Sequence, residues 1–365
     1  MQRQLLIGLF LLLALAACTP SAEVVEPAET PDSALQALDS LMQQRPDSAL
    51  ALLRSDVARN DSTTEYDRHY AQLLLAEALY KNDQAQTNRE DVLEAVRYFD
   101  SLADTRGVSL HGSGRRDASD VSAQTIAFLA ARAHYINGVG HYERDSIVAA
   151  CREYLTALEV MESHFGEKDL VGQKAKFMAL TYTRLTELFA DFYLHEQAIY
   201  FGKQSLAYYV KHDDSTWYIP FMIGEIGSHY DMMEEYDSAD FYYQKSLTVL
   251  TDTNDLIYRD ITTHLAFLDY KTGKGSEPSL TTLKNLVRQT VNKQEQLSRY
   301  LIVGDIYYHE NLFDSALVYF NHVFQESQNE ELKKQDAELL VEILKTQGRE
   351  SEILNMRNFW CHTPI

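Results

Sequence analysis

Apolar residues recur along most of this chain at the three- and four-residue spacing of amphipathic helices. From Pro31 onward nearly every segment has this period, and no run keeps the two-residue alternation of a strand for long. The pattern therefore predicts an all-α fold, in which successive helices pair as hairpins.

The tripeptide Asp-Ser-Ala marks several expected helix starts. Its four copies begin at Asp32, Asp47, Asp237 and Asp314. An aspartate side chain can accept hydrogen bonds from the unpaired amides of a new helix, so we predict that this residue is the N-cap. In the last two copies an aromatic residue, Tyr236 or Phe313, precedes the aspartate. We expect it to pack as a staple on the fourth helical position, Phe241 or Val318.

A second regularity stands at fixed distances from the alanines of these segments. Nine residues before Ala198, Ala239 and Ala316 stand Phe189, Tyr230 and Tyr307. Three residues before the last two of these aromatics stand Gly227 and Gly304, and four residues after the matching alanines stand Tyr243 and Phe320. This arrangement resembles the tetratricopeptide repeat (TPR), whose small residues seat one helix against the next. The resemblance implies a TPR-like solenoid of helical hairpins, wound as a right-handed superhelix and stabilised by contacts between neighbours.

The resemblance extends over residues 32–360 and varies in strength along them. The segments that match best are 179–210, 220–250 and 297–326. The segment Ala131–Leu158 fits only with an insertion, because Tyr135 and Ala150 are fifteen residues apart. The interval between Ala239 and Ala316 leaves room for one degenerate repeat, with helices around Leu265–Tyr270 and Leu280–Val287.

The first residues have the pattern of a sorting signal. Arg3 precedes the apolar run Leu5–Ala17, which is shorter than the roughly 20 residues that span a bilayer as a helix. The sequence Leu-Ala-Ala-Cys at residues 15–18 resembles the bacterial lipobox. The resemblance implies that residues 1–17 are a lipoprotein signal peptide and that Cys18 carries a covalent diacylglycerol and acyl lipid. The alternative is an ordinary signal peptide followed by a cysteine by chance.

Residues 18–31 contain three prolines and no helical period, so they are expected to form a flexible tether between the lipid and the folded body. In some bacteria an aspartate after the lipidated cysteine retains a lipoprotein in the inner membrane. Thr19 occupies that position here, and no dense acidic run follows Cys18. The resemblance therefore favours an outer-membrane lipoprotein that faces the periplasm.

Composition excludes several classes of protein. The chain has 365 residues and a formal net charge of −21, and we see no basic face on it, so nucleic acid is not an expected partner. Three cysteines cannot form a disulfide scaffold. His134 and His141 are seven residues apart, but no cysteine or carboxylate pattern completes a set of metal ligands around them. We expect no metal, no cofactor beyond the lipid and no enzymatic activity.

In TPR proteins the first helix of each hairpin lines the concave surface. Counting from the packing aromatics places a candidate partner-binding stripe at Arg184, Glu187, Asp191, Ser228, Asp231, Asp305, Tyr308 and His309. Tyr308 is the best candidate for an exposed aromatic side chain. The Lys/Asn clamp with which some TPR domains hold a peptide carboxylate is absent from these positions. The stripe therefore favours a neutral or basic protein segment, and the alternative is a solvated acidic face.

The lipobox followed by tyrosine-rich hairpins is similar to the TPR lipoproteins of Gram-negative envelopes. This implies a non-catalytic, lipid-anchored scaffold or sensor that binds a protein or peptide partner. Three other functions stay open. They are a glycan- or nutrient-binding lipoprotein, a shortened relative of envelope TPR regulators that carry a C-terminal DNA-binding output module, and an enzyme whose site is built from scattered residues.

Overall fold

The computed structural model describes residues 33–54, 64–84, 89–105, 121–212, 217–253, 255–274, 276–289, 293–327 and 330–353. All regular structure within these ranges is helical, which confirms the predicted all-α fold. No helix in the described ranges is both long enough and apolar enough to span a bilayer. The expected signal peptide, the lipidation site at Cys18, the tether and Asp32 lie outside the described residues, as do Arg106 to Asp120 and the chain after Ile353.

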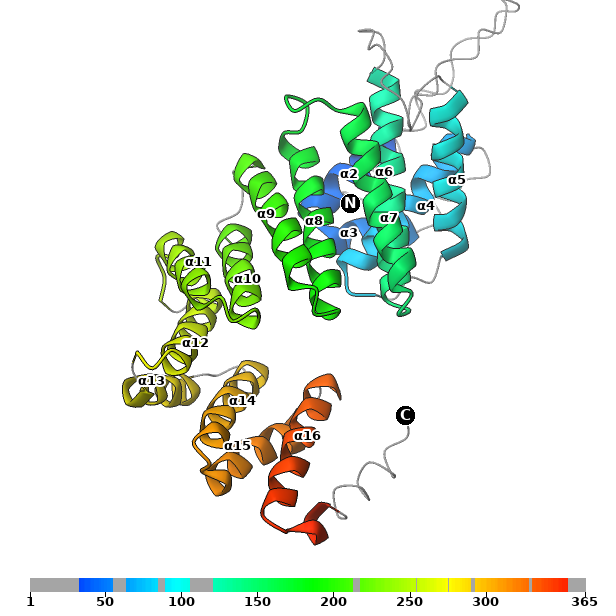
Figure 1. Cartoon of the computed structure of the whole chain (residues 1–365). Coiled ribbons are helices and arrows are strands. Elements are labelled where there is room, and N and C mark those ends of the chain that lie inside the picture. Colours follow the sequence, from blue (N-terminus) through cyan, green and yellow to red (C-terminus); the bar gives the residue numbers. More distant parts are fainter. Residues whose placement is uncertain are drawn as a thin grey trace, which may run out of the picture. The chain divides into compact units, whose positions relative to one another are not determined.

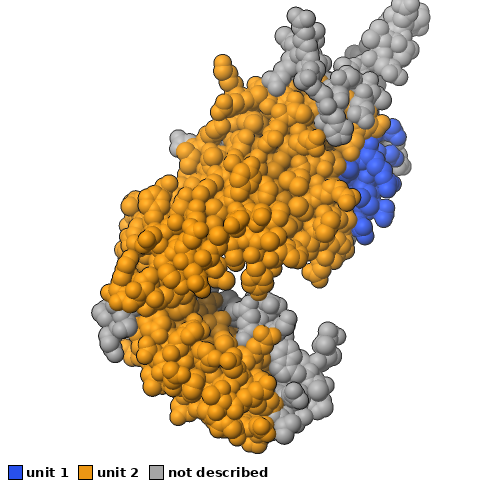
Figure 2. Space-filling model, viewed as in Figure 1, with its two compact units in different colours: residues 1–98 blue, residues 99–365 orange. Residues whose placement is uncertain are grey.

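The chain divides into two compact units, residues 1–98 and residues 99–365, which Figure 2 colours blue and orange. In the first unit α2 packs on α3, and both pack on α4. The hydroxyl of Tyr70 on α4 donates a hydrogen bond to Asp39 on α2 at 2.6 Å. The helices of this unit are α2 (Ser33–Gln44), α3 (Pro46–Arg54), α4 (Glu65–Lys81) and the first part of α5 (Arg89–Thr105).

The second unit is a series of antiparallel helical hairpins, each drawn in Figure 1 as two adjacent ribbons. Its helices after α5 are α6 (Val121–Tyr142), α7 (Ile147–His164), α8 (Gly172–Asp191), α9 (His195–His212), α10 (Tyr218–Met232), α11 (Tyr236–Val249), α12 (Leu256–Lys271), α13 (Ser276–Gln289), α14 (Lys293–His309), α15 (Phe313–Glu326) and α16 (Glu330–Thr346). The second helix of each hairpin packs on the first helix of the next. This nearest-neighbour packing defines a TPR-like solenoid.

In three hairpins a glycine of the first helix lies beneath an aromatic ring of the second. A Cβ atom on the glycine would fall 2.6–2.8 Å from the ring, closer than carbon atoms approach. The ring follows the glycine by sixteen residues in each case, and the pairs are Gly138 with Tyr154, Gly227 with Tyr243, and Gly304 with Phe320. These rings are buried, so the absent side chain of the glycine sets how closely the two helices approach.

In the hairpin of α8 and α9 the small residue and the large residue of this contact exchange helices. Gly202 takes the place of the aromatic ring, and Thr186 stands sixteen residues before it, in the place of the glycine. A Cβ on Gly202 would lie 3.1 Å from Ile226 and 3.6 Å from Thr186. The missing aromatic residue at Gly202 is therefore matched by a larger residue on the facing helix.

The insertion expected between Ala131 and Leu158 is wrong. The first helix of this hairpin contacts the second through Gly138, twelve residues before Ala150, as Gly227 and Gly304 stand twelve before their alanines. The position of the packing aromatic is then His141, and Tyr135 belongs to an earlier turn of the helix. The ring centroids of Tyr135 and Tyr154 are 5.7 Å apart, so Tyr135 also packs on the second helix although it stands at a different repeat position.

The turns within four of the hairpins share one backbone conformation. Five residues before each packing alanine, a non-glycine residue has a φ of 56° to 60°: Asp145, Tyr193, Glu234 and Asn311. The next amide donates a hydrogen bond to the carbonyl five residues back, at 2.8–3.0 Å, for example from Leu312 to Tyr307. This is the Schellman ending of a helix, and it leaves almost no linker before the next helix.

The tightness of these turns contradicts the predicted N-caps. Helices α11 and α15 begin at Tyr236 and Phe313, so Asp237 and Asp314 lie inside the first helical turn. Their charges still favour the positive end of the helix. The predicted staples are also wrong. Phe241 and Val318 are 60% and 55% exposed, so they lie on the surface and not in a buried contact.

His134 on α6 joins three helices through a buried polar network. Its Nδ1 lies 2.7 Å from Glu153 on α7, and its Nε2 lies 3.2 Å from Asp100 on α5. Burial alone would lower the pKa of His134, but the hydrogen bonds and negative charges of Asp100 and Glu153 outweigh it and raise the pKa to about 9. The imidazolium is therefore held charged between two carboxylates.

The Gly304→Ala substitution tests the close contact between Gly304 and the Phe320 ring. We expect the added methyl group to destabilise the protein by about 1–2 kcal/mol, because overpacking outweighs the higher helix propensity of alanine. Chemical denaturation followed by circular dichroism measures this. Adding Phe320→Leu should restore part of the loss, and Gly202→Ala should cost less, since its nearest contact at 3.1 Å is a movable side chain. An unchanged denaturation midpoint for Gly304→Ala would show that the contact between Gly304 and Phe320 does not limit how closely the helices pack.

His134 predicts a pH dependence of stability. The folded-state pKa is raised from 6.5 to about 9, so the stabilisation is fully present below pH 6.5 and is lost as the pH rises toward 9. Thermal unfolding of the wild type and of His134→Gln between pH 6 and pH 9.5 measures it. The difference between the two melting temperatures should shrink as the pH rises. A difference that is constant across this range would refute the charged network.

Candidate functional site

Helices α10, α12 and α14, each the first helix of its hairpin, enclose a pocket of about 420 Å³. We call it the first-helix pocket. Its apolar wall includes Trp217, Phe221, Leu256 and Ile302, and its polar lining includes Glu225, Ser228, Asp260, His264 and Arg299. Apolar walls with a few placed polar groups are the usual composition of ligand sites.

The aromatic part of the wall stands at the start of α10. Trp217 stacks on Phe221 with ring centroids 5.1 Å apart and planes within 8°, and the Trp217 side chain remains 46% exposed. A ring that is supported on one face and open to solvent is a rigid surface for an apolar segment of a ligand.

Negative charges from three hairpins act on the pocket. Burial, and next the charges of Asp260 on α12 and Glu187 on α8, raise the pKa of Glu225 to about 7. No cation in the described part of the chain forms an ion pair with Glu225. Asp260 lies 3.8 Å from the ring nitrogen of His264, one turn along the same helix. A cationic group in the pocket would therefore be attracted by both carboxylates.

Arg299 is the one arginine or lysine among the described residues that line the pocket, and it is already bonded to the protein. The side chain is almost fully buried. Its Nε donates to the Thr263 hydroxyl at 3.1 Å, and its Nη1 donates to the Leu286 carbonyl at 3.3 Å. Arg299 thus connects α14 to α12 and α13, and its geometry is that of a structural link.

Three of the stripe residues predicted from the sequence lie on α8, outside the pocket. Arg184 and Glu187 form an ion pair one turn apart on that helix. Asp191 accepts a hydrogen bond from the Tyr142 hydroxyl at the end of α6, which connects two successive hairpins. Glu187 does not line the pocket, but its negative charge contributes to the raised pKa of Glu225.

The stripe residues on α10 have different environments. Ser228 lines the pocket. Asp231, one turn further on, is buried, and its carboxylate lies 2.9 Å from the Lys271 ammonium on α12. A buried ion pair of this kind connects two hairpins, and removing the carboxylate would leave the charge of Lys271 uncompensated.

The predicted residues on α14 lie near its C-terminal end. Asp305 and His309 are 3.6 Å apart, and burial raises the pKa of Asp305. The Tyr308 hydroxyl donates to Glu342 on α16 at 2.7 Å, and its ring packs on the core around Phe320 and Leu340. Tyr308 is thus half-buried rather than fully exposed, because its ring packs on the core that α15 shares with α16.

The sequence contained a signal for part of what the prediction missed. Arg184 stands two residues before Thr186, and Glu225 stands two residues before Gly227, so the two occupy the same repeat position. Extending the stripe of α10 back by one turn would have included Glu225. Asp260 and His264 lie in the degenerate repeat. No glycine marks the register of that repeat, so the outward-facing positions of its first helix cannot be counted from the sequence.

Within the described ranges, no group of three histidine, cysteine, aspartate or glutamate side chains is arranged to hold a metal ion. His134 bonds two carboxylates, and His141 stands at the packing position of its hairpin.

No protein-family model and no curated protein sequence matches this chain. Several solved structures match it. The apo form of RapI aligns with a TM-score of 0.57 at 11% identity, over 89% of this chain and 88% of RapI. The Cut9 and Hcn1 assembly of the APC/C gives a TM-score of 0.49 at 15% identity, over 88% of this chain and 50% of that one. The C-terminal part of a TPR repeat-containing protein from Cytophaga hutchinsonii gives 0.44 at 12% identity, over 82% and 97%. At these identities the likeness to RapI shows the TPR-like fold alone.

Proposed function

We propose that this protein is a lipid-anchored scaffold or sensor that binds a neutral or basic segment of a protein partner in the cell envelope, without catalysis. The observation that carries the proposal is the first-helix pocket, in which Glu225 lines the same pocket as Trp217 and Phe221 and forms no ion pair within the described ranges. The described first helices continue on both sides of this pocket, and solenoids use such extended faces to bind segments of other proteins.

The chemistry of the pocket defines the segment that fits. An apolar or aromatic side chain contacts Trp217 and Phe221, and a lysine or arginine side chain next to it reaches Glu225 and Asp260. An acidic ligand would be repelled by the negative charges of Glu225 and Asp260, and burial strengthens this repulsion. A cationic group would return Glu225 toward its ordinary ionisation, so binding and ionisation favour each other.

The anchoring half of the proposal depends on the sequence of residues 1–31. The lipobox supports lipid attachment at Cys18, and Thr19 after it supports the outer membrane, with the folded body in the periplasm. A glycan- or nutrient-binding lipoprotein and an enzyme are the competing functions. Binding of neutral glycans on an array probed with the full chain would favour the first of these over a protein-binding scaffold.

Glu225→Gln tests the pocket. Full-length protein in detergent is used to select a phage-displayed library of unstructured peptides, and enriched peptides are synthesised for calorimetry. We expect them to combine lysine or arginine with apolar residues. Glu225→Gln should weaken their binding at pH 8 at least tenfold, which is about 1.4 kcal/mol. The exposed Glu196→Gln on α9 removes the same charge and should leave binding unchanged.

The same peptides should bind more weakly at pH 6 than at pH 8, because Glu225 takes up a proton as the pH falls through about 7. Glu225→Gln should flatten this dependence, and His264 and Asp260 line the pocket in both proteins. Enrichment of acidic peptides, or equal binding by Glu225→Gln and the wild type, would refute the pocket as the site.

Cys18→Ser tests the anchor separately. Growth with an alkyne-labelled fatty acid, followed by detection on the purified chain, should label the wild type and leave Cys18→Ser unlabelled. The wild type should also fractionate with outer membranes. A wild-type chain that carries no label would refute the lipid anchor and leave the peptide site unaffected.

A further inference from the structure

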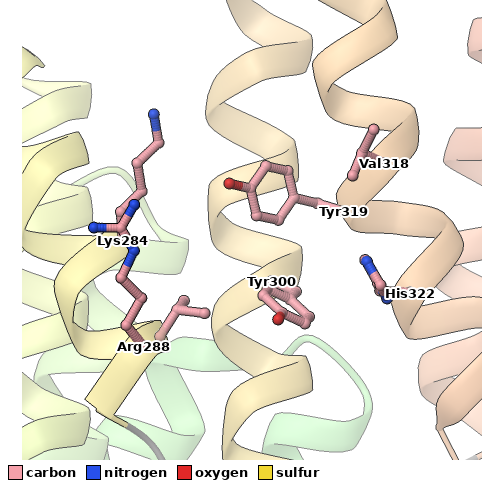
Figure 3. A pocket seen from close by; sticks show the side chains of 7 residues that line it. Lys284, Arg288, Tyr300, Val318, Tyr319 and His322 are labelled. Carbon is pink, nitrogen blue, oxygen red and sulfur yellow. The ribbon is translucent and has the colours of Figure 1, made fainter.

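A second pocket, of about 360 Å³, lies among α13, α14 and α15. We call it the cationic pocket. Figure 3 shows Lys284 and Arg288 of α13 on one side of it, and Tyr300 of α14 with Tyr319 and His322 of α15 on the other. It shares no lining residue with the first-helix pocket.

The charge of this pocket is opposite to that of the chain as a whole. Lys284 and Arg288 stand one helical turn apart, and no carboxylate is among the described residues that line the pocket. Within the described part of the chain neither of these cations forms an ion pair with a carboxylate. The Lys284 ammonium lies 5.0 Å from the centre of the Tyr307 ring, and Arg288 is exposed. In a protein with a net charge of −21, two neighbouring cations without a carboxylate partner among the described residues attract an anion to this pocket.

Glu326, the acidic residue one turn after His322 on α15, is already bound to other groups. Glu326 lies 3.2 Å from the His322 ring and also pairs with Lys293 at the start of α14. This pairing holds His322 beside Tyr300 and leaves the positive charges of α13 uncompensated.

The facing wall is a continuous series of aromatic rings. Tyr307 stacks on Tyr319 with centroids 5.6 Å apart, Tyr319 meets Tyr300 edge-on at 5.5 Å, and Tyr300 lies 5.4 Å from His322. Mutual contacts fix these rings in place. Rigid tyrosines offer apolar faces to the C–H groups of a ring and hydroxyls to its polar substituents.

We propose that the cationic pocket binds an anionic monosaccharide unit, that is, a sugar that carries a phosphate or a carboxylate. The anion lies between Lys284 and Arg288, and the sugar ring lies against Tyr300 and Tyr319. The volume lies within the usual range of small-molecule sites, and the lining comes from only three helices. A bound peptide would need a longer groove. A neutral sugar would leave both cations without a counter-charge.

Isothermal titration calorimetry of the full-length protein in detergent tests this proposal. The probes are glucose 6-phosphate, glucuronate, glucose, inorganic phosphate and a short polyglutamate peptide. We expect at least one of the two anionic sugars to bind at least tenfold more tightly than inorganic phosphate, glucose or the peptide. Comparing the two sugars distinguishes a phosphate from a carboxylate preference. If neither sugar binds, or if the peptide or inorganic phosphate binds as tightly, the proposal is overturned.

Two variants locate the binding in this pocket. Arg288→Gln removes one exposed cation and should weaken the preferred sugar at least tenfold. Arg152→Gln removes an exposed arginine from α7, changes the net charge equally and should bind as the wild type does. Saturation-transfer NMR should also show transfer from aromatic protons to the C–H protons of the sugar. Equal affinities of Arg288→Gln and the wild type, or absence of this transfer, would overturn the assignment.

Discussion

The contact between a glycine backbone and an aromatic ring determines the geometry of this protein. Where Gly138, Gly227 or Gly304 allows a ring to rest on its helix, the two helices of a hairpin can approach in one register only. That register decides which residues of the first helix face outward, and it places Trp217 and Glu225 in the same pocket. Both pockets take part of their lining from hairpins packed in this way, and the rest comes from the degenerate hairpin of α12 and α13.

Most of the fold was predictable because its rules are local. Fixed spacings of small, aromatic and alanine residues identify the hairpins, and the exchange of Gly202 and Thr186 obeys the same rule with the sizes reversed. The errors came from assigning roles by residue type. Asp237 resembles a cap, but the backbone turn before it already ends one helix and begins the next. Tyr135 resembles the packing aromatic, but it stands at the wrong position of the repeat.

The candidate sites were less predictable, because they depend on offsets between hairpins. Repeat spacing identifies which residues of α10 share a face, but it does not say that Lys271 reaches Asp231 or that Glu342 reaches Tyr308. These links occupy side chains that the sequence alone would leave available to a partner. Glu225 stands out only once the charges of Asp260 and Glu187, from two other hairpins, are placed around it.

The backbone conformation shared by the turns has a consequence for how the solenoid comes apart. A non-glycine residue with positive φ, such as Tyr193 or Glu234, costs of order 1 kcal/mol wherever it occurs. Tyr193 and Glu234 lie in hairpins that pack on a neighbouring hairpin at both sides, which offsets this strain. The helices at either end of the described array have a neighbour on one side alone. Local opening should therefore begin at the ends of the array and advance inward one hairpin at a time. Proteolysis under native conditions would then shorten the molecule from its ends and spare the middle repeats.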